Sequence, residues 1–381
     1  MKEPKRTWAE IDLDAIRHNY EQMRKRAGAG VKFLGVVKAD AYGHGALPVA
    51  EMLQKAGADY LAVACLDEAE SLRQGGITLP ILILGVTEPK YTGDLIRFGL
   101  TAAVADISTA EEMSRIALDL GQRVKVHLKV DTGMGRIGFI CRDDRDPVEQ
   151  LIRTAEMPGL DVEGIFTHFA TSDMPGEGDA YTETQYKAFR ALVQRVEEAR
   201  GKRFAIRHCA NSGAMTGHPD MFLDMVRPGI ALYGCYPSGL TGGLELRPAM
   251  AVRTRIAQVR DLLPGDTVSY GRTFTAAKPL RSAVVPIGYA DGLHRILSGK
   301  IDMLVRGKRV HQIGRICMDM CMLDVTDVPD VQEGDIVTFF GSDGNNCILV
   351  EEQAEKAGTI SYEILCAMSA RVKRVYMQRK E

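Results

Sequence analysis

Short apolar segments alternate with helical patterns over residues 32–227, and this alternation constrains the fold more than any other feature. The apolar segments have the length and composition of buried strands, while the segments between them have the spacing of amphipathic helices. Parallel strands need helical crossovers, and eight of them can close into a packed cylinder. The sequence therefore predicts a (β/α)8 barrel, with an open doubly wound sheet as the alternative. The expected strands cover 32–37, 60–65, 80–85, 100–105, 124–130, 162–167, 204–208 and 224–227.

Polar residues at the ends of several expected strands favour the barrel over the open sheet. Barrels of this kind build their sites from the loops at the carboxyl ends of the strands. The loops 211–213 and 228–230 follow expected strands seven and eight, where barrels most often bind phosphate. The polar residues at strand ends are Lys38, Lys129, Asp131, His168, Asn211, Ser212 and Arg227.

The second part of the chain has a different pattern. A chain of 381 residues exceeds what one hydrophobic core usually holds, so two domains are expected. After a glycine-rich linker at 239–243, short strand patterns and turns replace the alternation, and only 350–357 and 361–368 have helical patterns. We therefore expect an α/β barrel domain over residues 1–243 and a mostly β domain over residues 244–381.

Composition excludes several classes of partner. The formal net charge is -2, with acidic and basic residues interspersed, which does not favour nucleic acid or an anionic membrane as a partner. We expect no membrane span and no signal peptide, and hence a cytoplasmic protein, because apolar runs of the required lengths are missing from the sequence. The eight cysteines are scattered, so reduced thiols are expected rather than a zinc site or a disulfide framework.

Lys38 is the first candidate for chemistry. It follows the apolar, valine-rich segment 33–37 and precedes a turn that contains Tyr42, Gly43 and Gly45. Little water surrounds an ammonium group at the end of a buried strand, which favours the neutral amine that condenses with an aldehyde. Tyr42 has a phenol that can donate to a phosphate. The alternative is a lysine whose stem lies along the strand end and whose ammonium reaches solvent.

The stretch Val-Val-Lys-Ala-Asp-Ala-Tyr-Gly-His-Gly, residues 36–45, resembles the cofactor-attachment motif of the alanine racemase family. In that family the lysine carries pyridoxal 5'-phosphate, so the resemblance implies this cofactor on Lys38. At least seven segments in family order carry the resemblance, from Trp8 to Tyr376. One departure is Lys373, where family members commonly have proline; it lies outside the expected site.

A second signature is Asp-Thr-Gly-Met-Gly-Arg at 131–136. The resemblance implies that Arg136 reaches towards the substrate and the phenolic side of the cofactor. It also implies that Lys129 is carbamylated in some members, which makes it an anion that pairs with Arg136. Lys125, His127 and Lys129 alternate with apolar residues and share one face of the expected strand. That face either lines the barrel lumen or is a solvated basic face.

The resemblance assigns further roles in the barrel domain. It places the ring of His168 near the face of the pyridine, and it places Arg227 against the pyridine nitrogen, with His208 in support. A guanidinium group only donates hydrogen bonds, so it keeps that nitrogen unprotonated. The loops that follow strands seven and eight are expected to hold the phosphate through Asn211, Ser212, Gly229 and Ile230.

The resemblance also assigns residues of the β domain. The segment 267–274 contains Tyr270, which corresponds to the second catalytic base of the family. The loop 314–320 contains Met318, whose amide is expected to bind the substrate carboxylate. Tyr289 lies in the family's entrance segment, and Tyr362 is expected to donate to the phosphate. Taken alone, each of these side chains is more often a packing residue.

The resemblance implies a racemase that interconverts L-alanine and D-alanine through an external aldimine. Lys38 and Tyr270 would act on opposite faces of the α-carbon, since racemisation removes a proton on one face and adds one on the other. The family pattern is a head-to-tail homodimer, in which Tyr270 and Met318 complete the site of the partner chain. The alternatives are a racemase that also accepts serine, a barrel decarboxylase with a carboxylate in place of Arg227, and a non-catalytic carrier of the cofactor.

Overall fold

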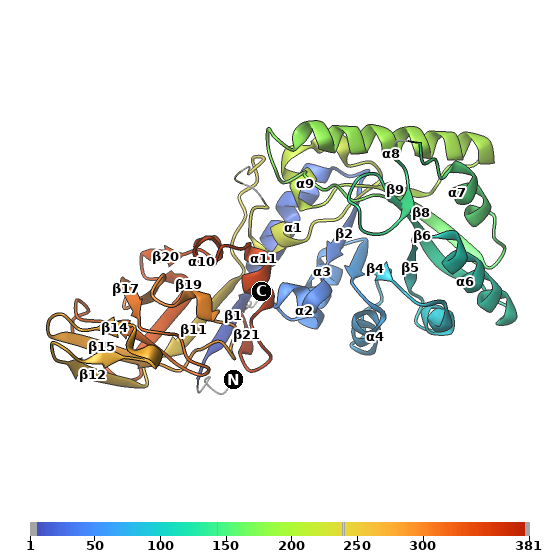
Figure 1. Cartoon of the computed structure of the whole chain (residues 1–381). Coiled ribbons are helices and arrows are strands. Elements are labelled where there is room, and N and C mark those ends of the chain that lie inside the picture. Colours follow the sequence, from blue (N-terminus) through green and yellow to red (C-terminus); the bar gives the residue numbers. More distant parts are fainter. Residues whose placement is uncertain (1–5, 143, 238, 240, 378–381) are drawn as a thin grey trace. The chain divides into compact units, whose positions relative to one another are not determined.

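The computed structural model describes residues 6–142, 144–237, 239 and 241–377 (Figure 1). Contacts group these residues into two compact units. The barrel unit contains residues 17–41 and the described residues of 46–246. The β unit contains the described residues up to 16, residues 42–45 and the described residues from 247 onward.

Parallel strands form the inner layer of the barrel unit. Among the described residues the sheet has the order β10-β2-β3-β4-β5-β6-β8-β9, and β7 pairs with β6. Two backbone bonds join its ends, from the Asp224 amide to the Arg207 carbonyl at 3.0 Å and from the Arg227 amide to the Ala210 carbonyl at 2.9 Å. The expected (β/α)8 barrel is confirmed. Its strands are β2 (Lys32–Val36), β3 (Tyr60–Val63), β4 (Ile81–Val86), β5 (Thr101–Val104), β6 (Val124–Asp131), β7 (Phe139–Ile140), β8 (Leu160–Phe166), β9 (Ile206–His208) and β10 (Met225–Val226).

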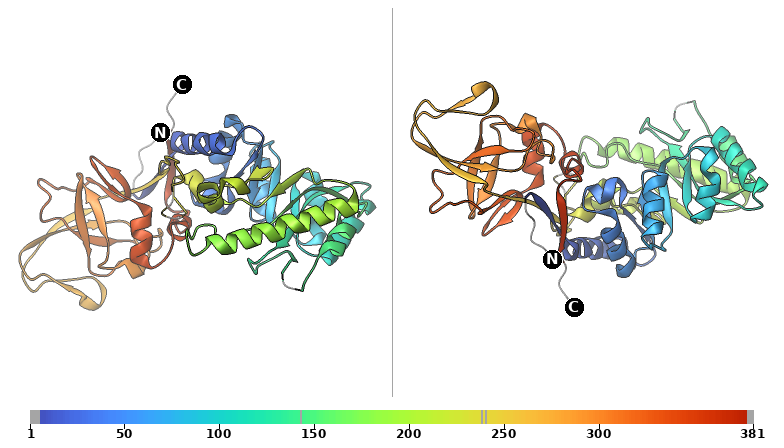
Figure 2. Two further views of the ribbon diagram at one scale, coloured as in Figure 1. Left: turned by 90° about the horizontal axis from the view of Figure 1, so that it is seen from above. Right: turned by 90° about the horizontal axis from the view of Figure 1, so that it is seen from below.

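Helices cover the outside of the strands, and Figures 1 and 2 show the longest of them, α8, at the edge of the barrel unit. The face of α8 that carries Phe189, Val193 and Val196 is buried, as the helical period requires. Asp106 caps α6 by accepting from the Thr109 amide. The helices are α1 (Leu13–Ala27), α2 (Lys38–Tyr42), α3 (Ala46–Ala56), α4 (Leu66–Gln74), α5 (Thr92–Arg97), α6 (Ile107–Asp119), α7 (Val148–Ala155), α8 (Asp179–Arg200) and α9 (Ser212–Gly217). The segment labelled α2 is not a right-handed helix, because φ and ψ at residues 39–41 are left-handed. Short 3-10 turns are η1 (Pro89–Tyr91), η2 (Pro219–Met221) and η3 (Ile230–Tyr233).

The β unit is built on a mainly antiparallel sheet with the order β12-β15-β18-β17-β16-β19-β11-β1-β21, and β20 pairs with β19. Strands β13 and β14 form a separate pair. The strands are β1 (Trp8–Asp12), β11 (Met250–Arg255), β12 (Gln258–Leu262), β13 (Thr267–Val268), β14 (Phe274–Thr275), β15 (Leu280–Val285), β16 (Asp302–Val305), β17 (Lys308–Ile313), β18 (Cys321–Asp324), β19 (Ile336–Asp343), β20 (Asn346–Ile348) and β21 (Lys373–Met377). The helical pieces are α10 (Val350–Ala357), α11 (Ser361–Cys366), η4 (Tyr270–Arg272) and η5 (Arg295–Leu297).

The two compact units are not separated by a single division of the chain between residues 243 and 244, because the β unit also includes residues near the start of the chain. Strand β1 pairs with β11 and, in parallel, with β21, which ties the start of the described chain to the β unit. Residues 42–45 also belong to the β unit, because Gly45 packs directly against Tyr376. A Cβ atom on Gly45 would lie 1.9 Å from the phenol oxygen of Tyr376. Residue 240 of the expected linker lies outside the described residues. Gly242 accepts from the guanidinium of Arg26, so this part of the linker is anchored within the barrel unit.

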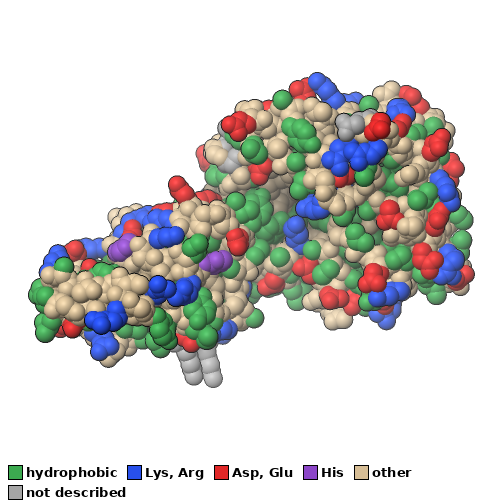
Figure 3. Space-filling view, viewed as in Figure 1, with side chains coloured by type: hydrophobic (Ala, Val, Ile, Leu, Met, Phe, Trp, Pro, Cys, Tyr) green, Lys and Arg blue, Asp and Glu red, His purple; other side chains and the backbone are tan. Residues whose placement is uncertain are grey.

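Acidic and basic side chains are interspersed over the face of the molecule in Figure 3. In the part of the chain that the structure describes, no helix combines the length and the apolar character needed to cross a membrane. Within the same residues, no group of three or more His, Cys, Asp or Glu side chains is placed to bind a metal ion.

Candidate active site

The carboxyl ends of the barrel strands bring the expected polar residues together. Lys38 follows β2, Lys129 lies near the end of β6, and His168 follows β8. Arg227 follows β10, and one of its guanidinium nitrogens lies 3.3 Å from His168 Nδ1. Burial lowers the pKa of His168 well below its ordinary value, and the charges of Arg227, Lys129, Arg136 and Lys38 lower it further. The groups predicted from separate strands therefore lie in one electrostatic neighbourhood.

The chain makes a left-handed turn after Lys38. The φ angles of the next four residues, 39–42, lie between 52° and 54°. Left-handed geometry costs about 1–2 kcal/mol for each residue with a Cβ atom. The sequence indicated a turn built on Gly43 and Gly45, but it begins with Ala39. Two carboxylates hold it, since Glu68 accepts from the Ala39 amide at 2.6 Å and Asp40 accepts from the Ala46 amide at 2.7 Å. Backbone strain of this kind is concentrated at functional sites.

Arg227 is almost fully buried and donates to several acceptors. One terminal nitrogen donates to His208 Nδ1 at 2.9 Å, and the other donates to the Thr167 carbonyl at 2.9 Å and the Cys209 carbonyl at 3.2 Å. Its guanidinium also lies over the ring of Phe166, 5.4 Å from the centroid. Burial lowers the pKa of Arg227 to about 10, so the group is still a cation near neutral pH. The site thus holds a fixed, donor-only cation.

The contact between Arg227 and His208 determines the tautomers of two histidines. Because a guanidinium group only donates, His208 Nδ1 must accept and carries no proton. The neutral His208 ring is then protonated on Nε2, which lies 2.8 Å from His127 Nδ1 and donates to it. His127 is therefore protonated on Nε2. Burial and the charge of Arg227 lower the pKa of His127 to about 3 and that of His208 well below its ordinary value, so both rings are neutral.

Lys129 lies inside the barrel and is 2% exposed. Its ammonium donates to the Val130 carbonyl at 3.1 Å and lies 5.0 Å from the centre of the Phe166 ring. Burial lowers the pKa of Lys129 to about 7, with further lowering by Arg227 and Arg136. The shared face of β6 lines the lumen at His127 and Lys129 only. Lys125 is exposed and pairs with Glu163 at 2.9 Å, so one lysine rather than two is removed from water.

Asp131 shapes the loop that carries Arg136. Its carboxylate accepts from the amides of Gly133 at 2.8 Å and Gly135 at 3.1 Å. These bonds lower the pKa of the Asp131 carboxyl against the opposing effect of burial. Arg136 itself is exposed in the isolated chain, and its charge acts on Lys129, His168 and Arg227.

The loops after β9 and β10 form a cradle of donors. Ser212 Oγ accepts from the Gly229 amide at 2.8 Å and the Ala231 amide at 3.4 Å. Both lone pairs of the hydroxyl are thereby used, which leaves its proton to donate to an anion. Among the described residues, the Ile230 amide has no hydrogen-bond partner. The side chain of Asn211 caps α9 by accepting from the Ala214 amide at 3.0 Å, and it also accepts from the Ser172 hydroxyl.

Two tyrosines of the β unit lie beside each other. The ring centroids of Tyr42 and Tyr362 are 5.8 Å apart, with an angle of 60° between the planes. Burial raises the pKa of Tyr42, and Tyr362 raises it further, so its phenol is protonated and able to donate. Arg374 fixes the backbone next to Tyr42 by donating to the Gly43 carbonyl at 2.9 Å. A Cβ atom on Gly43 would lie 2.4 Å from the Leu365 carbonyl oxygen.

Tyr270 and Met318 line one groove of about 530 Å³ in the β unit. Tyr270 is 70% exposed and Met318 is 52% exposed. Ser269, whose φ is 67°, anchors the turn by donating from its hydroxyl to the Arg315 carbonyl at 2.6 Å. Tyr289 is not part of the lining. It lies in a neighbouring turn and is 43% exposed.

Two residues of the site, Gln185 and Phe166, were not among the predicted site residues. Gln185 in α8 is fully buried, donates to Thr132 and the His168 carbonyl, and accepts from the Ala170 amide. A buried glutamine on an amphipathic helix has no sequence signal of its own. Phe166 could have been found from the sequence, because it lies near the end of an expected strand, two residues before His168.

Comparisons with known proteins cover nearly the whole chain. The family model described as "Alanine racemase, N-terminal domain" matches residues 11–237, and the model described as "Alanine racemase, C-terminal domain" matches residues 249–376. A protein named alanine racemase from Desulforamulus reducens is 47% identical over 379 residues, which cover 99% of this chain and 100% of the relative.

Solved structures agree with these matches. The structure of alanine racemase from Clostridium difficile 630 has 42% identity and a TM-score of 0.92, and covers 99% of this chain and 97% of the other. The structure of alanine racemase from Bacillus anthracis with bound L-Ala-P has 36% identity and a TM-score of 0.91, and covers 99% of this chain and 96% of the other.

Proposed function

The chain belongs to the alanine racemase family, and we propose on this premise that it interconverts L-alanine and D-alanine with pyridoxal 5'-phosphate as cofactor. The proposal assigns the cofactor to the polar residues of the barrel unit together with Tyr42 and Tyr362, and the substrate carboxylate to Arg136 and the Met318 amide. It assigns proton transfer at the α-carbon to Lys38 and Tyr270.

The donor groups of the chain fit this cofactor. The Ser212 hydroxyl proton and the Ile230 amide suit a phosphate, and the proposal adds the protonated phenol of Tyr42 and the phenol of Tyr362 as further donors. The Lys38 amine suits the aldehyde. When bound, the cofactor withdraws electrons from the α-carbon of the substrate and so makes its proton removable.

The buried guanidinium of Arg227 carries the proposal. It can donate but not accept, so a ring nitrogen placed against it stays unprotonated. An unprotonated ring would be a weaker electron acceptor, which would favour return of the proton to the α-carbon and disfavour transamination. The alternative, a barrel decarboxylase, is expected to have a carboxylate at this position, and Arg227 with its histidine neighbours cannot take that role.

Two residues of the chain move the protons. Lys38 serves the D face and Tyr270 serves the L face, because racemisation needs a base on each side of the α-carbon. We assign Tyr270 and Met318 to the site of a partner chain in a homodimer. Their exposure in the isolated chain supports this assignment, since a tyrosine that is 70% exposed beside exposed methionines is typical of an interface.

We further propose that Lys129 is carbamylated. A pKa of about 7 leaves much of the amine neutral and able to react with carbon dioxide near neutral pH. The resulting anion would balance Arg136 and Arg227. Incubation with 13C-bicarbonate should give a carbamate resonance that is missing in Lys129→Met, and equal spectra for the two proteins would contradict the assignment.

The experiment that tests the proposed function follows optical rotation for a panel of L-amino acids that includes alanine and serine. Mirror-image products are isoenergetic, so the rotation of a true substrate should decay to zero. Lys38→Ala should lose this activity and the absorbance of the bound cofactor. The panel also decides between strict alanine specificity and a wider range of small amino acids. Unchanged rotation for every member would refute the proposal.

A further inference from the structure

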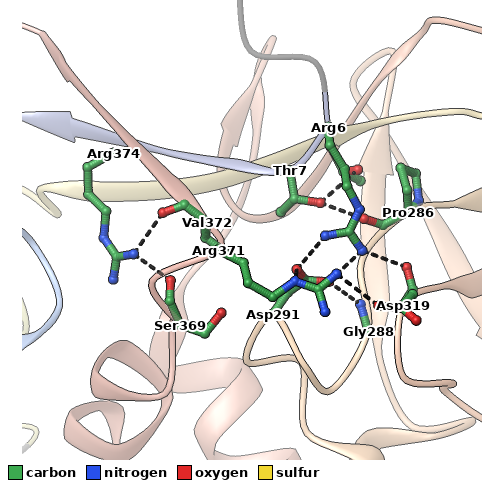
Figure 4. Close-up of polar contacts among 11 residues, drawn as sticks. Arg6, Thr7, Pro286, Gly288, Asp291, Asp319, Ser369, Arg371, Val372 and Arg374 are labelled. Carbon is green, nitrogen blue, oxygen red and sulfur yellow. Dashed lines mark hydrogen bonds and ion pairs between the residues drawn. The ribbon is translucent and has the colours of Figure 1, made fainter.

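A buried carboxylate lies at the centre of a cluster of charges in the β unit (Figure 4). Asp291 is fully buried and accepts from both terminal nitrogens of Arg6, at 2.6 Å and 2.9 Å. It also accepts from the Gly288 amide at 3.0 Å, and Arg371 Nε lies 3.3 Å from the same carboxylate. A buried charge is tolerated only when it is paired and hydrogen-bonded, and these contacts meet that condition.

The two arginines extend from Asp291 to Asp319. A terminal nitrogen of Arg371 lies 2.8 Å from the Asp319 carboxylate, so its guanidinium bridges the carboxylates of Asp291 and Asp319. Arg6 also donates to the Asp319 carbonyl at 2.9 Å. The side chain and the backbone of Asp319 are thus held from separate parts of the chain. Asp319 directly follows Met318, the residue whose amide is assigned to the substrate carboxylate.

The turn 288–291 holds Met318 from the other side. The Gly288 amide donates to the Asp291 side chain, which closes the turn. The next two amides of the turn donate to the loop that carries Met318. The Tyr289 amide donates to the Cys317 carbonyl at 3.1 Å, and the Ala290 amide donates to the Met318 carbonyl at 3.0 Å. The approach requires glycine, since a Cβ atom on Gly288 would lie 2.4 Å from the Met318 carbonyl oxygen.

These contacts fix the backbone on both sides of Met318. Its carbonyl is bonded to the turn, and the following residue is bonded to two arginines, while its own amide has no partner among the described residues. We propose that Asp291, with Arg6 and Arg371, positions the Met318 amide to receive the substrate carboxylate. The inference rests on the proposed function. It makes Asp291 and the two arginines positioning residues, because they act through the Met318 loop and touch no substrate.

The test compares Arg371→Met with Arg309→Met. Arg309 is a matched control because its side chain is 40% exposed and pairs with Glu352, while Arg371 is 43% exposed and pairs with Asp319. The readouts are KM and kcat for alanine, the thermal midpoint, and the inhibition constant of propionate, a carboxylate that lacks the amine. Arg371→Met should raise KM and the propionate constant by about tenfold, as expected for loss of one charge-assisted hydrogen bond.

Three further results decide the proposal. Arg309→Met should leave KM and the propionate constant within about twofold of wild type, as expected of a surface pair. Arg371→Lys should recover part of the loss, because an ammonium group can pair with one of the two carboxylates but cannot bridge them as the guanidinium does. A lower thermal midpoint in Arg371→Met with unchanged KM and propionate binding would reduce the cluster to a structural role and overturn the inference.

A mixed dimer separates this inference from the proposed function. A dimer of one Lys38→Ala chain and one Arg371→Met chain has one site with Lys38 intact, and that site receives Met318 from the chain with Arg371 intact. Its KM should equal the wild-type value. A KM raised about tenfold would show that Arg371 acts on the site of its own chain and would contradict the inference. Absence of racemisation in the wild type would instead remove the proposed function.

Discussion

At the scale of single residues, the site depends on which atoms carry protons. Arg227 can only donate hydrogen bonds, so it determines which ring nitrogen carries the proton in His208 and, through His208, in His127. Both rings must be neutral with the proton on Nε2. His208 therefore accepts from Arg227 and donates to His127, and these two bonds fix the position of the guanidinium.

The tautomers of the two histidines are directly measurable. In protein with 15N-labelled histidine, long-range proton-nitrogen correlation spectra should show His127 and His208 as neutral, Nε2-protonated rings from pH 6 to 9. The resonances can be assigned with His127→Phe, which removes one of them. A proton on Nδ1 of His208, or a ring that titrates in this range, would contradict the arrangement.

Lys129 predicts a specific pH dependence of stability. Below pH 7 the amine is protonated in both the folded and the unfolded chain, so burial destabilises the fold fully. Between pH 7 and its ordinary value of 10.5, the unfolded chain holds a proton that the folded chain lacks. The contribution of Lys129 to the free energy of unfolding therefore rises with pH in this window.

Thermal midpoints of wild type and Lys129→Met test this dependence in buffer free of carbon dioxide. The variant has no titrating group at this position, so its advantage in thermal midpoint should be largest near pH 7 and should shrink towards pH 10. Two parallel profiles over this range would mean that Lys129 stays charged in the folded protein.

At the scale of secondary-structure elements, the left-handed turn 39–42 can be tested by its response to glycine. Glycine adopts positive φ without a steric cost, although it costs about 0.5–1 kcal/mol in the entropy of the unfolded chain. Ala39 is exposed and its φ is 52°. Ala39→Gly should therefore leave the free energy of unfolding unchanged or raise it by up to ~1 kcal/mol.

Ala191 supplies the matched control, since it is exposed in the middle of α8. Ala191→Gly should lower the free energy of unfolding by about 1 kcal/mol, as in an ordinary helix. Denaturant titration of both variants gives the comparison. Equal losses in the two variants would show that the turn after Lys38 is not left-handed in solution.

Much of the barrel could be predicted because each strand and helix has its own local pattern. The expected strand 124–130 and the observed β6 differ by one residue, and the helix expected over 350–357 has the observed bounds of α10. Polar residues at strand ends also indicated the barrel mouth correctly. The left-handed turn was not predictable, because its alanines favour right-handed helix, whereas the carboxylates of Glu68 and Asp40 that bond to the backbone at its two ends have no local sequence signal.

Contacts between distant parts of the sequence were also beyond prediction. Arg6 and Asp291 are 285 positions apart, and nothing near either residue indicates the other. The same holds for β1, which has the pattern of a strand but no local sign that it pairs with β11 and β21. Asn211 follows an expected strand, but the sequence did not indicate that its side chain caps α9.

At the scale of the whole molecule, the proposed function requires two chains. Lys38→Ala and Tyr270→Phe should each be inactive as homodimers. A purified dimer with one chain of each kind should regain about half of the wild-type activity, since one of its two sites contains both Lys38 and Tyr270. No recovery in the mixed dimer would mean that each chain uses its own tyrosine.

The most direct test of the central claim follows the proton at the α-carbon. Incubation of the protein and pyridoxal 5'-phosphate with L-alanine in deuterium oxide should yield D-alanine that carries deuterium at that carbon, and Lys38→Ala should yield none. Mass spectrometry after separation of the enantiomers measures both. Formation of D-alanine by Lys38→Ala at the wild-type rate, or no D-alanine with wild type, would contradict the account.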